Sequence, residues 1–297
     1  MKIPEEIFSD NAISYDINYD TARLSHIKAG GVADYIAFPE TEDQLVNIIR
    51  EFTENSISYK IIGNCSNVFF SDDGFRGVII SVKQLKKVCF MDNFLLSSPG
   101  MSIQRLMLEC KRKNFAIPAQ LCGIPGSIGG MVRGNAGAFG KSISDIFLWA
   151  KVYCPKKDKI LIYSKNDMNF SYRSSVLDNE QLCLLEVALS ITKEFSQVFS
   201  DKINHFSQIR SKSQPNEASL GSFFKRSDDV IPALLIDELG LKGYSVGGAS
   251  ISEKHAGFII NRGGACSKDI NLLASYVEKR VKEAYGITLI REAEYVT

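Results

Sequence analysis

Residues 123–140 read GIPGSIGGMVRGNAGAFG, and seven of these eighteen residues are glycine. An ordinary turn needs one or two glycines. This segment therefore has far more backbone without side chains than a turn requires. It holds neither the Gly-Lys-Ser/Thr of a P-loop nor a GxGxxG after a strand. We interpret it as a backbone-lined surface in which Pro125-Gly126 turns, Ser127 caps the residues after it, and free N–H groups bind an anion. A tight turn before a closely packed helix is the structural alternative.

A second loop has the same character. The apolar strand predicted at 59–62 runs directly into Gly63-Asn64-Cys65-Ser66-Asn67, whose small residues expose N–H groups. The two loops are about sixty residues apart and together suit a ligand with two phosphates, such as the pyrophosphate of a dinucleotide. A reactive thiol at Cys65 is the alternative use of this loop.

Composition excludes several classes of function. The chain has 297 residues, 35 Lys plus Arg and 34 Asp plus Glu, so a nucleic-acid partner is not expected. The opening MKIPEEIF lacks a secretory h-region, and no apolar run reaches the length of a membrane helix, which predicts a cytoplasmic protein without membrane contact. The seven cysteines and three histidines are scattered, so no metal site is predicted. The length predicts two or three domains, with a boundary near 195–200.

Periodicity and capping signals predict the main elements. A capping box at Thr41–Gln44 opens a helix that Asn55 closes, and Ser267 is the expected N-cap of a helix that ends before Gly286. The other predicted helices are 102–114 and 231–239, and the predicted strands are 59–62, 78–82, 147–154, 159–163, 181–192 and 287–296, with 147–163 forming a hairpin.

Six ordered motifs carry a family resemblance. They are IIGNCSNVFFSDDGFRGVII (61–80), GIPGSIGGMVRGNAGAFG (123–140), FSYRSSVL (170–177), LGSFFKR (220–226), GGASISEKHAGFIIN (247–261) and GITLIREAE (286–294). Together they resemble UDP-N-acetylenolpyruvoylglucosamine reductase over nearly the whole chain. The short spacing from Arg173 to Ser222 resembles the shorter subtype of that family.

The resemblance implies an α+β fold. It consists of a two-subdomain FAD-binding domain of the vanillyl-alcohol-oxidase (PCMH) type and a C-terminal α/β substrate domain. The implied limits are 1–197 for the FAD-binding domain, with subdomains of about 1–85 and 86–197, and 198–297 for the substrate domain. The implied reaction passes hydride from NADPH to FAD and then to an enolpyruvyl ether of a UDP-sugar, giving UDP-N-acetylmuramate for peptidoglycan. A monomer is expected.

The resemblance also assigns residues to the cofactor. Those expected to hold FAD are Gly63, Asn64, Cys65, Ser66, Asn67, Gly123, Pro125, Gly126, Ser127, Gly129, Gly130, Asn135, Ala136 and Gly137. Cys65 stands where the family usually has glycine, Gly134 replaces a larger apolar residue, and Ser227 stands at a common proline position. None of these departures removes a catalytic group.

Three residues are implied to be catalytic. Ser222 is the implied proton donor, and a serine can act so only with positioned neighbours in a dry site. Arg173 suits a carboxylate and the enolate charge that develops beside it. Glu292 is implied to act with Arg173, and Glu294, two residues on, is the competing assignment.

Tyr172, Lys225 and His255 are candidate substrate contacts, with a structural role as the alternative for His255. Lys212 could replace a lysine that is frequent at position 213 in the family. The alternative function is that of an FAD-dependent oxidase or dehydrogenase of the same superfamily. A flavin- or nucleotide-binding protein without catalysis is the third interpretation, and the presence of Ser222, Arg173 and Glu292 together disfavours it.

Overall fold

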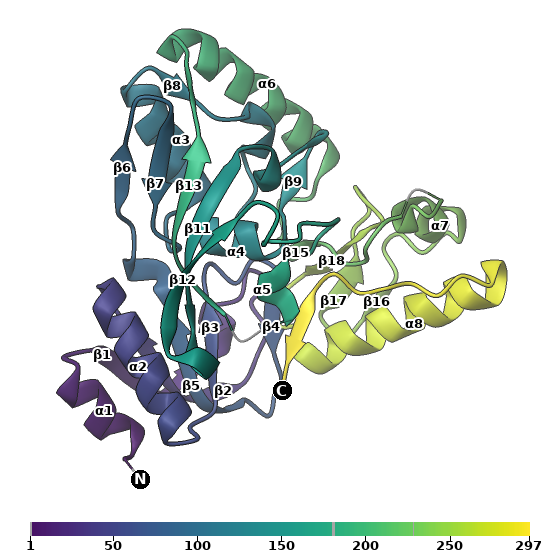
Figure 1. Ribbon diagram of the computed structural model, residues 1–297. Coiled ribbons are helices and arrows are strands. Elements are labelled where there is room, and N and C mark those ends of the chain that lie inside the picture. The colour runs from purple at the N-terminus through teal and green to yellow at the C-terminus, as the bar shows by residue number, and fades with distance from the viewer. Residues whose placement is uncertain (1, 180–181, 228) are drawn as a thin grey trace. The chain divides into compact units, whose positions relative to one another are not determined.

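The chain divides into two compact units in the computed structural model, which describes residues 2–179, 182–227 and 229–297 (Figure 1). Unit 1 comprises Met1–Ile17, Tyr35–Asn64 and Gly77–Ile209, and unit 2 comprises Asn18–Asp34, Cys65–Arg76 and Arg210–Thr297. Unit 2 is therefore built from three segments of the chain and not from its C-terminal third alone. The crossing from unit 1 to unit 2 after Asn64 lies inside the predicted 63–67 loop.

A four-stranded sheet occupies the N-terminal part of the chain. Its order is β1 (Ser14–Asp20), β2 (Val32–Phe38), β5 (Phe75–Ser81) and β3 (Tyr59–Ile62), with β3 parallel to β5. Helices α1 (Pro4–Asp10) and α2 (Glu42–Glu54) supply Phe8 and Phe52 to the buried cluster of this part of unit 1. The predicted capping box is confirmed, because Thr41 Oγ1 accepts the N–H of Gln44 and the Gln44 side chain accepts the N–H of Thr41.

A five-stranded antiparallel sheet forms the larger part of unit 1. Its order is β12 (Lys159–Ser164), β11 (Phe147–Cys154), β13 (Cys183–Ser190), β7 (Phe94–Ser97) and β6 (Val88–Phe90). The predicted hairpin is confirmed, with Cys154 opposite Lys159. Strand β13 confirms most of the strand predicted at 181–192, of which residue 181 lies outside the described residues.

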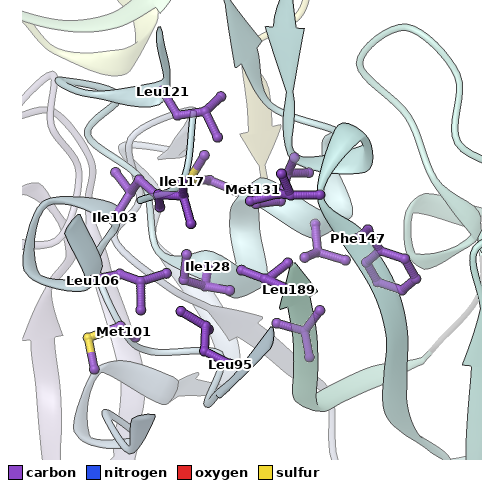
Figure 2. Packing of buried hydrophobic residues seen from close by; sticks show 14 of the residues in the cluster. Leu95, Met101, Ile103, Leu106, Ile117, Leu121, Ile128, Met131, Phe147 and Leu189 are labelled. Atoms are coloured by element: carbon purple, nitrogen blue, oxygen red, sulfur yellow. The ribbon is translucent and has the colours of Figure 1, made fainter. Parts of the chain in front are cut away.

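Helices α3 (Ile103–Arg112) and α4 (Ile128–Arg133) pack on this sheet. Ile128 and Met131 of α4 lie among Leu95, Leu106 and Leu189, so the glycine-rich segment is anchored in the main core of unit 1 (Figure 2). The smaller elements of unit 1 are β8 (Phe115–Ala116), β9 (Gly137–Ala138), β10 (Lys141–Ser142), β14 (Thr192–Lys193), α5 (Val176–Asn179) and single 3-10 turns at Val82–Gln84, Ala119–Leu121, Ile143–Asp145 and Pro155–Lys157.

Helix α6 (Ser196–Ser213) has no counterpart in the sequence prediction. Its amphipathic pattern is weak and Phe199 is its only residue in the buried class, so periodicity gives little signal there. The predicted domain boundary near 198 falls within this helix, whereas unit 1 ends at Ile209.

Unit 2 is built on a four-stranded antiparallel sheet. Its order is β15 (Ala218–Ser222), β18 (Phe258–Asn261), β17 (Ala249–Ile251) and β16 (Ser245–Val246). Helix α8 (Ser267–Tyr285) packs on β16 and β17, and α7 (Pro232–Glu238) contacts α8 (Figure 1). A 3-10 turn at Thr21–Arg23 and strand β4 (Val68–Phe70), parallel to β19 (Glu294–Val296), complete the unit.

Two predictions about the C-terminal part are wrong. The strand predicted at 287–296 is limited to β19, because its partner β4 has only three residues. The predicted N-cap of α8, Ser267, is instead its first helical residue, and Cys266 is the N-cap. The hydroxyl of Ser267 donates to the carbonyl of Phe70, while the Asp72 carboxylate accepts the N–H groups of Ser267 and Lys268, each at 2.8 Å. The cap is therefore supplied by a residue almost two hundred positions earlier in the chain.

We predict that Asp72→Ala lowers the free energy of unfolding by about 1–2 kcal/mol, because it leaves two N–H groups of the first turn of α8 without their cap. Urea denaturation followed by circular dichroism measures the change. Asp73→Ala is the matched control on the adjacent exposed residue. Equal effects of the two variants would contradict a capping role for Asp72.

Candidate active site

The glycine-rich segment uses most of its N–H groups within the protein. Ser127 caps α4 as expected, and its Oγ accepts the N–H of Gly130 at 3.3 Å. The N–H groups of Ile128 and Gly129 donate to the carbonyls of Met101 and Pro99, each at 2.8 Å. The expectation of free N–H groups at the start of α4 is therefore wrong. Gly129 of α4 allows close packing, since a Cβ on it would lie 2.9 Å from the Cβ of Pro99.

The two loops that the sequence paired meet within unit 1. A Cβ on Gly63 would lie 2.0 Å from Ser127 Oγ, a separation that real Cβ atoms do not adopt. A Cβ at position 63 would therefore push the Ser127 hydroxyl out of its cap position. Beyond Gly63, none of the residues that the structure describes accepts the N–H groups of Asn64 and Ser66. Both residues are half-buried.

Cys65 and Asn67 complete this loop in unit 2. Cys65 is buried and has a φ of +48°, in the left-handed region that glycine adopts without steric strain. Its carbonyl accepts the N–H of His26 at 3.1 Å. Asn67 donates from Nδ2 to the carbonyl of Glu292 at 2.9 Å and accepts the N–H of Glu294 at 2.9 Å. The end of the predicted cofactor loop is thus hydrogen-bonded to the segment that holds the predicted catalytic glutamate.

Arg173 and Asn135 join the 170–174 turn to the glycine-rich segment. Asn135, at the end of α4, donates from Nδ2 to the carbonyl of Ser171 at 2.9 Å. Arg173, with a φ of +53°, donates from Nη2 to the carbonyl of Gly137 at 3.0 Å. Its guanidinium also lies over the ring of Tyr172, 5.1 Å from the centroid, and Tyr172 is 45% exposed. Four residues predicted to bind cofactor or substrate or to act in catalysis are therefore together in unit 1.

Ser222 and Glu292 come from neighbouring segments in unit 2. Ser222 is the exposed last residue of β15 and follows Gly221, whose φ is +79°. The next residue, Phe223, donates its N–H to the carbonyl of Gly257 at 2.9 Å and accepts the N–H of Glu292 at 2.8 Å. The residue directly after the predicted proton donor therefore makes the backbone contact with the predicted glutamate.

Lys225 and Glu292 share one face of this pairing. Phe224 and Arg291 form an antiparallel bridge, flanked by the bond from Glu292 to Phe223 and by that from the N–H of Lys225 to the carbonyl of Ile290, 2.8 Å. Side chains alternate along extended backbone, so Lys225 and Glu292 leave the face opposite Phe224 and Arg291, the face that also carries the buried Phe223. Lys225 and Glu292 are themselves half-buried.

His255 is linked to the Ser222 strand through Gly257. Its Nδ1 accepts the N–H of Gly257 at 3.1 Å, and its ring meets Phe258 edge-on at 4.9 Å. Burial lowers the pKa of His255 below its ordinary value. The ring is therefore neutral at pH 7 and carries its proton on Nε2, where it can donate to a ligand.

Arg291, which the sequence analysis assigned no role, precedes Glu292 and is bound to α8. Its guanidinium makes four hydrogen bonds to Asn271, Ser275 and Glu278 of α8. A signal existed in the spacing of these three polar residues, which places them on one face of the predicted helix.

The residues 2–179, 182–227 and 229–297 contain no group of His, Cys, Asp and Glu side chains placed to hold a metal ion. None of the helices in the described ranges is both long and apolar enough to cross a membrane.

Comparisons with known proteins identify the two domains and the family. Residues 33–160 match the family model described as an FAD binding domain, and residues 214–296 match that of the UDP-N-acetylenolpyruvoylglucosamine reductase C-terminal domain. UDP-N-acetylenolpyruvoylglucosamine reductase of Clostridium kluyveri is 36% identical over 95% of this chain and 93% of its own length. The enzyme of the same name from Caldicellulosiruptor saccharolyticus is 39% identical over 91% of this chain and 87% of its own length.

Solved structures give the same result. The crystal structure of UDP-N-acetylenolpyruvylglucosamine reductase from Thermus caldophilus matches with a TM-score of 0.81 and 26% identity, over 96% of this chain and 99% of that chain. BBE-like 1 of Physcomitrella patens matches in fold alone, with a TM-score of 0.54 and 14% identity over 65% of this chain and 45% of that chain. The expected fold class, an FAD-binding domain with a C-terminal substrate domain, is confirmed. The chain belongs to the UDP-N-acetylenolpyruvoylglucosamine reductase family.

Proposed function

We propose that the protein reduces the enolpyruvyl ether of UDP-N-acetylglucosamine-enolpyruvate to UDP-N-acetylmuramate, a step of peptidoglycan precursor synthesis, with FAD as cofactor and NADPH as reductant. The observation that carries the proposal is the hydrogen bond from the N–H of Glu292 to the carbonyl of Phe223, the residue after Ser222. It joins the backbone of Glu292 to the residue after Ser222, so the two residue types that this reduction needs, a proton donor and a carboxyl group, come from neighbouring segments. Membership of the reductase family and the FAD-binding match at residues 33–160 support it.

The cofactor assignment rests on the two loops. The N–H groups of Asn64 and Ser66 and the glycine approach at Gly63 fit a pyrophosphate, and we keep the predicted set of residues 63–67 and 123–137 as the FAD site. FAD, when bound, supplies the hydride for the terminal vinyl carbon. The N–H groups of Gly129 and Gly130 already have acceptors, so Gly129 would act in this site through its close packing on Pro99.

The protein groups would supply the proton and stabilise charge. Ser222, exposed at the end of β15, would donate a proton to the carbon adjacent to the carboxylate. Arg173 would pair with the substrate carboxylate, and Glu292 would act on the enolate charge that develops. Lys225, Tyr172 and the Nε2–H of His255 would contact the rest of the substrate.

An oxidase or dehydrogenase of the wider superfamily is less well supported. The likeness to BBE-like 1 concerns the fold alone. The reductase C-terminal domain, matched at residues 214–296, contains Ser222, Lys225, His255 and Glu292. The domain limits of 1–197 and 198–297, the monomeric state and the cytoplasmic location stay predictions of the sequence.

We predict that Ser222→Ala leaves the reduction of flavin by NADPH intact and slows the following reaction with the enolpyruvyl substrate by about 10²–10⁴-fold, because only the second step requires its proton. Anaerobic stopped-flow absorbance of the flavin measures the two steps separately. Ser219→Ala, on the same strand, is the control. Equal slowing of both steps would argue against a proton donor at Ser222.

Gly63→Ala is expected to raise the Kd for FAD several-fold and to cost about 1 kcal/mol of stability, because the new Cβ displaces Ser127 from its cap. Flavin fluorescence during titration of the apoprotein measures the Kd, and urea denaturation measures the stability. Ser127→Ala, which loses the cap without the clash, shows the contribution of the cap alone. An unchanged Kd for FAD in Gly63→Ala would contradict the assignment of Gly63 to the cofactor site.

Acidification is expected to weaken the fold through His255. Since its folded-state pKa lies below the ordinary 6.5, the unfolded chain takes up the proton first as the pH falls below about 6.5. The stability contribution is full above that value and is lost as the pH falls through the folded pKa. Urea denaturation at pH 7.5, 6.5 and 5.5 checks this, and His255→Gln should show a smaller loss between pH 7.5 and 5.5. The same loss in both proteins would contradict it.

A further inference from the structure

Glu292 lies between α8 and β19 in a segment that belongs to neither element but is locally extended at its bridge with Phe224. Its peptide is nevertheless held on both sides, since its N–H donates to Phe223 at 2.8 Å and its carbonyl accepts from Asn67 Nδ2 at 2.9 Å. These bonds hold the main chain of Glu292 itself. The direction of its side chain also depends on its neighbour Arg291, whose side chain leaves the opposite face of the extended backbone.

Arg291 is anchored to α8 by a dense set of contacts. Its Nε and Nη2 donate to the two carboxylate oxygens of Glu278 at 2.6 and 3.0 Å. Its Nη1 donates to Asn271 Oδ1 and its Nη2 also donates to Ser275 Oγ, both at 2.9 Å. The three partners are four and three positions apart on α8, so the guanidinium lies along one face of the helix. The side chains of Arg291 and Glu278 are only 29% and 30% exposed.

This set of contacts needs arginine. A bidentate pair with a carboxylate uses the planar fork of the guanidinium, which the point charge of lysine cannot reproduce. The pairing with Glu278 also neutralises a cation directly beside Glu292 in the chain. Anchoring Arg291 to α8 therefore directs the side chain of Glu292 away from this helix, to the face it shares with Lys225.

We propose that Arg291 is a positioning residue: by its fourfold attachment to Asn271, Ser275 and Glu278 it orients the Glu292 carboxylate for the reaction. The inference rests on the proposed function in one respect, the catalytic role of Glu292. Arg291 itself touches neither substrate nor cofactor in this scheme. Residues 286–293 lie outside the helices and strands of the fold, and the four hydrogen bonds of Arg291 tie this segment to α8.

The orientation can be tested without activity. In Arg291→Lys, hydrogen exchange of residues 286–293, followed by mass spectrometry, should become at least about tenfold faster, while β18 exchanges as in the wild type. Lys279→Gln is the matched control, because it removes an exposed α8 ion pair with Glu283 that does not involve Arg291 or Glu292. Unchanged exchange of residues 286–293 in Arg291→Lys would overturn the proposal, whatever the activity.

The catalytic consequence is measured on the FAD-loaded protein. Arg291→Lys should slow the reaction of the reduced protein with the enolpyruvyl substrate by about 10- to 100-fold and leave flavin reduction by NADPH within about twofold. In a Glu292→Gln background the same substitution should add little, because the group that it positions is already gone. Slowing of both steps alike, or full additivity with Glu292→Gln, would reduce Arg291 to a structural residue.

The two proposals fail differently. If the wild-type protein transfers nothing from NADPH to the enolpyruvyl substrate, the proposed function fails while the exchange result still decides whether Arg291 holds the segment. If the wild type is active and Glu292→Gln is as fast as the wild type, the role of Glu292 fails and the catalytic role of Arg291 falls with it. For Arg291→Lys we expect faster hydrogen exchange of residues 286–293 and a slower reaction with the enolpyruvyl substrate. We expect that slowing only where Glu292 is present.

Discussion

The hydrogen bonds that incorporate Cys65–Arg76 into unit 2 constrain much of the rest of the structure. Asn67 holds the carbonyl of Glu292, β4 pairs with β19, and Asp72 caps α8. The chain leaves unit 1 after Asn64, so the loop predicted to bind the cofactor belongs to both units by covalent connection. The loop predicted to bind the cofactor cannot shift at Asn67 without disturbing the backbone of Glu292. In the proposed function, cofactor binding and the placement of the Glu292 carboxylate would therefore be coupled through one short segment.

The glycine-rich segment uses its N–H groups at the start of α4 inside the protein and not, as predicted, to bind an anion. Its N–H groups at positions 128–130 bond to Met101, Pro99 and Ser127, and its glycines allow the backbone to approach these neighbours. The alternative of a turn before a closely packed helix therefore accounts for α4. Among the described residues, N–H groups without a protein acceptor occur in the other loop, at Asn64 and Ser66, and in this segment at Gly123 and Ser127. In the proposed cofactor site, the helix would contribute by packing and these groups would be the donors.

The sequence predicted elements well where the determining interactions are local. The Thr41 capping box, the hairpin of β11 and β12 and the apolar stripe of α8 all act within a few residues, and all are present. The predictions failed where distant residues decide. Asp72, far away in the chain, accepts two N–H groups of the first turn of α8, next to a local capping box between Cys266 and Asp269. The last strand is only as long as its three-residue partner β4. Helix α6 was missed because it buries little.

In the candidate site, too, some residues could be predicted from local motifs and others could not. The types of residue that the reaction needs could be named from motifs, because Ser222, Arg173 and Glu292 each stand in a recognisable local pattern. The groups that orient them are contributed from elsewhere: Gly257 accepts from Phe223, Gly137 accepts from Arg173, and α8 holds Arg291. These partners are carbonyl groups and a helix face, which no local motif specifies. Since hydride and proton transfer depend on direction as much as on residue type, a sequence can indicate the reacting groups of such a site while its rate depends on contacts that only the fold brings together.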